Sequence, residues 1–123
     1  MVAHRHARHD VERQAFLLGA KLDAMHVAES PQQPGVPNAA LARIITLRRA
    51  TSWWAREPVY LDRLGVSAMP SGIDVRRFRD RDGATLLAID NPQQRAGKTV
   101  RVDGRAVSIP ADALSIRVLE TGA

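Results

Sequence analysis

Alternating apolar and polar residues flank a two-residue turn in the stretch Thr99–Ile109, which reads TVRVDGRAVSI. Successive side chains of a β-strand point to opposite faces, so the apolar positions on both sides of the turn share one face. These positions are Val100, Val102, Val107 and Ile109. Asp103-Gly104 suits a type I′ turn, because both central residues need positive φ, which glycine adopts freely and aspartate tolerates better than most residues. The stretch therefore predicts a β-hairpin.

Further strands are predicted on both sides of this hairpin. After Pro110 the same alternation continues through Leu114, Ile116 and Val118. Upstream, the predicted strands are 59–61, 73–78 and 85–89, with a turn at 81–83, a break at 90–92 and a polar loop at 93–97. Five or six strands in about sixty residues are typical of a small antiparallel β-sandwich or open barrel.

The first half of the chain is predicted to be mainly helical. Asp10 suits an N-cap and Gly19 a left-handed C-terminus, which predicts a helix over 10–18. A short strand is favoured for 20–25, although a helical continuation fits the same residues. The run 29–37 holds three prolines and predicts an extended surface loop.

A second helix is predicted to begin after Asn38 and to end before Pro58, because the residue before a proline is disfavoured in helical geometry. Its apolar stripe is Leu41, Ile44, Leu47 and Trp54, and its polar side is Arg43, Arg48 and Arg49. The predicted fold class is α+β, with a mobile end and helical segment in residues 1–57 and an antiparallel β-domain in residues 58–123.

Composition sets limits on the class of protein. Hydrophobic residues at 45% and charged residues at 25% are typical of a globular protein, and the absence of cysteine excludes disulfides and thiolate metal sites. No apolar run reaches the roughly 20 residues that span a bilayer, and the polar start lacks a signal-peptide pattern. We therefore expect no membrane partner and, for the chain as written, a cytoplasmic location. A longer polypeptide would leave the location undetermined.

The net charge of +5 raises the question of nucleic-acid binding. Residues 1–60 hold 8 basic and 5 acidic residues, and residues 61–123 hold 10 and 8. Since neither half is a basic block, a nucleic-acid partner is not expected.

Histidine and carboxylate clusters are the candidate sites for metal or acid–base chemistry. His4, His6 and His9 have a spacing that could bind Zn or Ni, but no carboxylate pattern frames them, and we favour a solvated chain end. The aspartates at 62, 74, 80, 82 and 90 lie in turns or among arginines, where they commonly bracket the backbone. No catalytic residue, metal or cofactor is assigned.

Aromatic residues and one aspartate are the candidate ligand contacts. Trp53, Trp54 and Tyr60 could stack on a sugar. The alternative is that one tryptophan seals the helix against the sheet while the other lies at the edge of that seam. Asp23, three residues before His26, could contact a substrate as acid, base or ligand.

The order of motifs resembles the C-terminal part of a glycoside hydrolase. The segment QAFLLGAKLD, residues 14–23, looks like the last helix-strand step of a (β/α)₈ barrel, and LARIITLR, residues 41–48, looks like its closing helix. The segment YLDRLGV, residues 60–66, resembles the link that follows such a barrel. LLAIDNP, residues 86–92, the Asp103-Gly104 hairpin and IPA, residues 109–111, are similar to the trailing β-sandwich.

In such enzymes the catalytic carboxylates come from earlier barrel strands, which this chain does not contain. The resemblance therefore implies a non-catalytic scaffolding or accessory portion, with Met1 as an internal or late start. It also places Asp23 near the end of the last barrel strand, as a peripheral substrate contact. The alternative is a free-standing binding module. Its ligand would be carbohydrate, or a protein partner that covers the sheet face or the barrel remnant.

Overall fold

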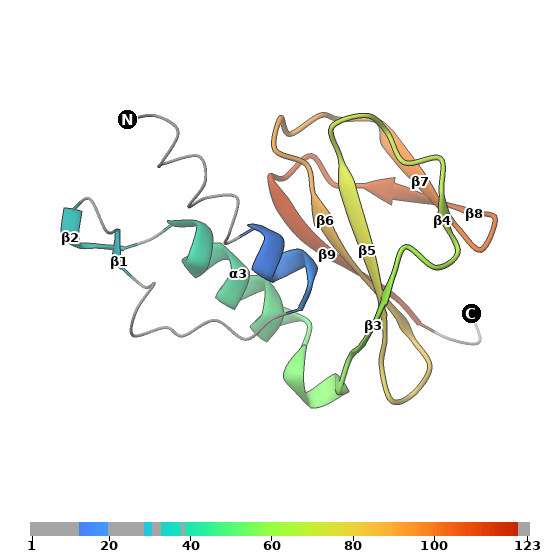
Figure 1. Ribbon diagram of the computed structural model, residues 1–123, viewed down its shortest axis with the longest axis horizontal. Helices are drawn as coiled ribbons and strands as arrows, with labels where there is room; N and C mark the ends of the chain where they lie inside the picture. The colour runs from blue at the N-terminus through green and yellow to red at the C-terminus, as the bar shows by residue number, and fades with distance from the viewer. Residues whose placement is uncertain (1–12, 20–28, 31–32, 38, 121–123) are drawn as a thin grey trace.

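The computed structural model describes residues 13–19, 29–30, 33–37 and 39–120. Apart from a two-stranded ribbon within residues 29–37, these residues form three layers, namely a helical layer, a four-stranded sheet and a three-stranded sheet (Figure 1). All strand pairs are antiparallel. The predicted α+β class is confirmed, and the two facing sheets form a sandwich.

The helical layer contains two helices and a short 3₁₀ turn. Residues 13–17 are helical, and Gly19 follows with φ 74°, which confirms its predicted role at the helix end. The second helix, α3, spans Ala39–Ala50, and the 3₁₀ turn η1 spans Trp54–Arg56. Neither is long and apolar enough to cross a membrane, nor is any other helix in the described part of the chain. The predicted caps Asp10 and Asn38, the strand 20–25 and the histidine cluster lie outside the described residues.

The four-stranded sheet has the order β3 (Val59–Asp62), β5 (Asp74–Arg79), β6 (Thr85–Asp90) and β9 (Leu114–Leu119). Asp80 holds the turn between β5 and β6, because its Oδ1 accepts the backbone N–H groups of Asp82 and Ala84 at 2.9 Å each. The predicted turn role of this aspartate is confirmed.

The three-stranded sheet has the order β4 (Val66–Ser67), β7 (Lys98–Val102) and β8 (Arg105–Ile109). Asp103 and Gly104 join β7 to β8 with φ of 52° and 79°, which confirms the predicted I′ geometry. The short strand β4 was not predicted, because two residues are too few to show alternation.

An aliphatic inner cluster fills the space between the two sheets. Ile73, adjoining β5, and three strand residues supply the side of the four-stranded sheet, and the hairpin β7–β8 supplies the other side. The cluster contains Ile73, Val75, Leu87, Ile89, Val100, Val102, Val107 and Ile109. The hairpin therefore packs its apolar face on β5 and β6, as the alternation predicts.

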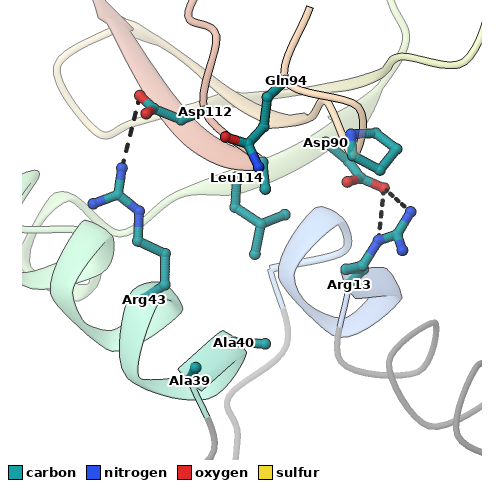
Figure 2. Close-up of a pocket in the computed structure, with 10 residues that line it drawn as sticks. Arg13, Ala39, Ala40, Arg43, Asp90, Gln94, Asp112 and Leu114 are labelled. Carbon is teal, nitrogen blue, oxygen red and sulfur yellow. Dashed lines mark hydrogen bonds and ion pairs between the residues drawn. The ribbon is translucent and has the colours of Figure 1, made fainter.

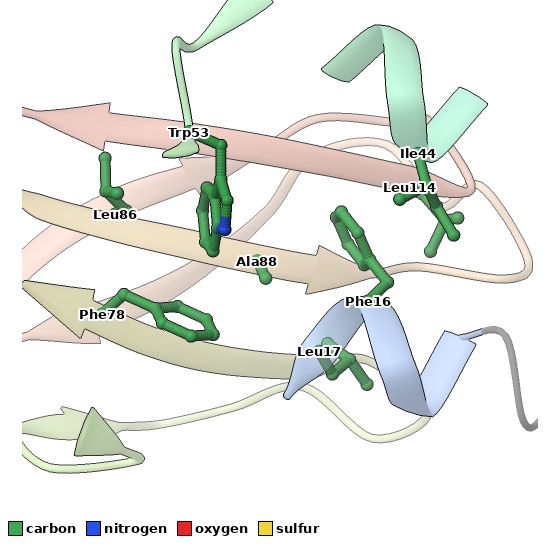
Figure 3. Close-up of a cluster of buried hydrophobic side chains, with 8 residues drawn as sticks. All are labelled: Phe16, Leu17, Ile44, Trp53, Phe78, Leu86, Ala88 and Leu114. Carbon is green, nitrogen blue, oxygen red and sulfur yellow. The ribbon is translucent and has the colours of Figure 1, made fainter. Parts of the chain in front are cut away.

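A second, partly aromatic cluster lies on the opposite face of the four-stranded sheet, under the helical layer (Figure 3). This outer cluster contains Phe16, Leu17, Ile44, Trp53, Phe78, Leu86, Ala88 and Leu114. Every residue of β6 is buried, because its side chains alternate between the two clusters. The four-stranded sheet is thus the central layer of the molecule.

The second helix ends before Pro58, as predicted, but the prediction that its apolar stripe extends to Trp54 was wrong. Helix α3 ends at Ala50, well before Pro58, and Ser52 takes a left-handed φ of 54°. The chain turns there, so that Trp53 enters the outer cluster while Trp54 begins η1. The proline sets only a limit on helix length, and packing of Trp53 on the sheet ends the helix earlier.

The predicted loop over 29–37 was also wrong. Strand β1 (Glu29–Ser30) pairs with β2 (Gln33–Pro37) in a small antiparallel ribbon, with Glu29 opposite Pro37 and Ser30 opposite Gln33. Proline favours extended backbone, and in a two-stranded ribbon its missing N–H can face the free edge. The same prolines that indicated a loop are therefore compatible with strand pairing.

Candidate functional site

The predicted aromatic contacts separate into one buried ring and two accessible rings. Trp53 is 1% exposed and meets the Phe78 ring edge-on at 4.7 Å between centroids. Trp54 is 49% exposed and Tyr60 is 36% exposed. Trp53 thus occupies the position that the packing interpretation predicts, whereas Trp54 and Tyr60 keep accessible surface. Asp23 lies outside the described residues.

The side of Arg48 differs from the prediction. Instead of facing solvent, Arg48 is buried, and its guanidinium lies 5.2 Å from the centroid of Trp54, 5.9 Å from Trp53 and 6.0 Å from Phe16. Burial lowers the pKa of Arg48 to about 10, so it still carries its charge at neutral pH. Cation–π contact with aromatic rings partly replaces the lost hydration. Arg48 therefore fastens α3 to the helix at 13–17.

A polar network surrounds Tyr60 on the outer face of the four-stranded sheet. The Tyr60 hydroxyl donates to Asp62 Oδ1 at 3.0 Å and accepts from Arg76 Nη1 at 2.6 Å. Arg76 also binds Asp74 through Nε at 3.0 Å and Nη2 at 3.2 Å, and Arg63 donates to the same carboxylate at 3.0 Å. We call Tyr60, Asp62, Arg63, Asp74 and Arg76 the Tyr60 network.

Hydrogen bonds between Asp74 and Arg76 favour the charged forms of both groups. Partial burial alone would raise the pKa of Asp74, but the hydrogen bonds from Arg76 and Arg63 outweigh it and lower that pKa. The hydrogen bond to Asp74 raises the pKa of Arg76 above its ordinary value. Asp74 and Arg76 thus keep fixed charges over the whole neutral range.

A pocket lies between the helical layer and one end of the sandwich (Figure 2). This interlayer pocket has a volume of about 400 Å³. Arg13 stands on one side and binds Asp90 Oδ2 through Nε at 3.1 Å and Nη2 at 3.0 Å. Arg43 stands on the other side, 3.8 Å from Asp112. The remaining lining is Ala39, Ala40, Pro92, Gln94, Ala113 and Leu114.

The chemistry of the interlayer pocket is balanced. Among the described lining residues two arginines face two aspartates, so these residues give no excess of either charge, and none of them is aromatic. Within the described residues, no group of three His, Cys, Asp or Glu side chains could hold a metal ion. The pocket's ion pairs join the helical layer to the sandwich.

A buried arginine closes the opposite end of the sandwich. Arg77 on β5 donates to Asp103 in the β7–β8 turn at 3.0 and 2.8 Å, and also to the carbonyl of Leu64 at 2.9 Å. The hydrogen bonds from Arg77 lower the pKa of the Asp103 carboxyl. The same Asp103 that favours the I′ turn therefore also ties the two sheets together.

Sequence reasoning missed the partners of Tyr60. Asp74 and Arg76 are two residues apart on one strand, so period-2 alternation could have placed them on one face. The contact between Arg76 and Asp62 could not be predicted from the sequence, because a register irregularity between Tyr60 and Asp62 changes the strand pairing. Asp62 has φ 56°, which the sequence did not signal.

Comparison of the chain with protein-family models, curated proteins and solved structures found no match.

Proposed function

We propose that this chain is a non-catalytic scaffolding portion of a glycoside-hydrolase-like protein, in which the β-sandwich holds a helical segment in place. The observation that carries the proposal is the outer cluster. Phe16, Leu17 and Ile44 of the helical layer are each at most 1% exposed where they pack on the sheet. A sheet face covered this completely serves as a platform for the elements that precede it.

Two ion pairs support the same role. Arg13 binds Asp90 at 3.0 Å at one end of the helical layer, and Arg56 of η1 binds Asp80 at 2.9 Å at the other. Both aspartates are buried residues of the sandwich. Leaving a buried charge without its partner costs more than the pair contributes, so these contacts favour one placement of the layer.

Three carboxylates of the described residues support a non-catalytic role. Glycoside hydrolysis by paired carboxyl groups needs an acid with a raised pKa opposite a second carboxylate. The pKa values of Asp74, Asp80 and Asp103 are instead lowered, because arginine or backbone N–H groups stabilise their charged forms. These aspartates bind neighbouring parts of the fold.

An activity screen on aryl-glycosides tests the proposal. The full chain is passed over a size-exclusion column, and each fraction is assayed with a panel of chromogenic glycosides. We expect no hydrolysis that follows the protein peak. Turnover that elutes with the chain and scales with its amount would refute the non-catalytic role.

A further inference from the structure

The Tyr60 ring is held rigidly at the edge of the four-stranded sheet. Tyr60 lies directly opposite Phe78 in the β3–β5 register, and the two ring centroids are 5.2 Å apart. Phe78 is 2% exposed, so it forms a fixed base under Tyr60. The hydroxyl is held by Asp62 and Arg76, which leaves the ring little freedom to rotate. A ligand that meets this ring loses little entropy in ordering it.

Unused hydrogen-bonding groups lie in the same network as the ring. The Asp62 side chain is 63% exposed, and both of its hydrogen bonds within the described structure end on Oδ1. Its Oδ2 is therefore open as an acceptor. The Arg63 side chain is 47% exposed and donates one hydrogen bond from a terminal nitrogen to Asp74, so its other N–H groups can bind a ligand. The acceptor on Asp62 thus lies next to the Tyr60 hydroxyl, and the donor on Arg63 lies in the same network, on the carboxylate of Asp74 that Arg76 also binds.

The charge of the network selects the ligand class. Two aspartates and two arginines balance, so neither an anion such as phosphate nor a cation is favoured. An aromatic ring with planar polar groups at its side fits a molecule that has an apolar face and several hydroxyl groups. We propose that the Tyr60 network binds a neutral saccharide, with a sugar ring on Tyr60 and its hydroxyls on Asp62 and Arg63.

The tryptophans are poorer platforms than Tyr60. Trp53 is buried in the outer cluster, and the Arg48 guanidinium lies 5.2 Å from the Trp54 centroid. The saccharide site therefore adds a ligand to the sandwich without using the helical layer. Its scaffolding role stands whether or not the site exists.

A titration of the full chain with neutral oligosaccharides tests the site. Maltohexaose, cellohexaose and xylohexaose are each added up to about 20 mM, since an open surface site of this size is expected to bind in the millimolar range. Amide NMR signals are followed. We expect at least one sugar to shift the signals of Tyr60, Asp62 and Arg63 in a saturable way. Silence of these signals with all three sugars would overturn the proposal.

Four variants locate the binding. Tyr60→Ala should weaken it about 10-fold or more, because the stacking ring is a central contact. Asp62→Asn should weaken it about threefold, and Tyr60→Phe, which keeps the ring and the fold, should weaken it by less than Tyr60→Ala. Trp54→Ala is the control and should leave it unchanged. Loss of binding with Trp54→Ala but not with Tyr60→Ala would contradict the assignment, as would preferential binding of an anionic polysaccharide such as polygalacturonate.

Discussion

The two faces of the four-stranded sheet are buried in different ways. The inner cluster is aliphatic, and all its residues come from 73–109, where hairpins join neighbouring strands. The outer cluster contains three aromatic rings and combines residues 16, 17, 44 and 53 with the strands. The inner face is thus covered by residues close in sequence to the strands, and the outer face by residues distant from them in sequence. The difference indicates that β6, buried on both sides, needs the helical layer as much as the second sheet.

The largest expected effect separates the two adjacent tryptophans. Trp53→Ala should lower the free energy of unfolding by about 3 to 5 kcal/mol, because it opens a large cavity in the outer cluster. Trp54→Ala should cost about 1 kcal/mol or less, mainly the contact with Arg48. Urea unfolding followed by circular dichroism measures both. Equal losses would show that Trp53 does not seal the outer face.

A neighbouring pair on β6 compares the faces directly. Leu86 faces the outer cluster, Leu87 faces the inner cluster, and both are fully buried. We expect Leu86→Ala and Leu87→Ala each to cost about 2 to 4 kcal/mol. Chemical denaturation of the two variants under the same conditions gives the comparison. A cost for Leu86→Ala below about 1 kcal/mol would mean that the outer face is packed loosely.

Gly65 tests the ion pair between Arg77 and Asp103, which joins the two sheets. It has φ 74°, and a Cβ there would collide with the Asp103 and Arg77 side chains. Gly65→Ala should therefore cost about 1 to 2 kcal/mol from backbone strain, and it should cost more than the same change at a glycine with open space around it because it also displaces the ion pair. Gly97→Ala is the control, because it shares the positive φ and meets nothing within 4 Å. Thermal melts of the two variants should differ, and matching melting temperatures would show that the ion pair yields without loss.

The smallest expected effect is a pH dependence at the ion pair between Arg56 and Asp80. Burial alone would raise the pKa of Asp80, but N–H groups of Ala84 and Asp82 and the Arg56 guanidinium outweigh it and lower the pKa. A lowered folded-state pKa stabilises the fold at pH values above the unfolded-state pKa of about 3.9. This stabilisation is lost as the pH falls through the folded-state pKa.

Asp80→Asn should therefore cost about 1.5 kcal/mol at neutral pH, and this cost should shrink below about pH 4. Stability curves of the chain and the variant between neutral pH and acid test the trend, with the exposed Asp82→Asn as the control. A cost that stays constant down to the lowest pH would rule out ionised Asp80 as its source.

Local patterns were sufficient for the inner face. The Asp103-Gly104 hairpin and the strand after Pro110 were predicted correctly, because period-2 alternation and turn chemistry are properties of neighbouring residues. The run from Ala84 to Ile89 is almost entirely apolar, which is typical of a strand buried on both faces. This signal could have indicated a third layer.

The outer face and the Tyr60 network depend on contacts between distant segments. Arg48 was placed on a polar side because a helical pattern shows only which residues share a face. Its burial results from Phe16 and Trp53, which other segments bring to it. The helix end at Ala50 and the irregular pairing at Asp62 likewise have no local signature. The resemblance to glycoside hydrolases remains a prediction.

A single urea titration with two probes tests whether the helical layer and the sandwich unfold as one unit, across the predicted boundary between residues 57 and 58. In a Trp54→Phe background, fluorescence reports on Trp53 in the outer cluster, and the NMR amide signal of Val100 reports on the inner cluster. We expect the two transitions to coincide, as they do for a two-state domain. A Trp53 transition at a clearly lower urea concentration than the loss of the Val100 signal would show that the helical layer and the sandwich unfold separately.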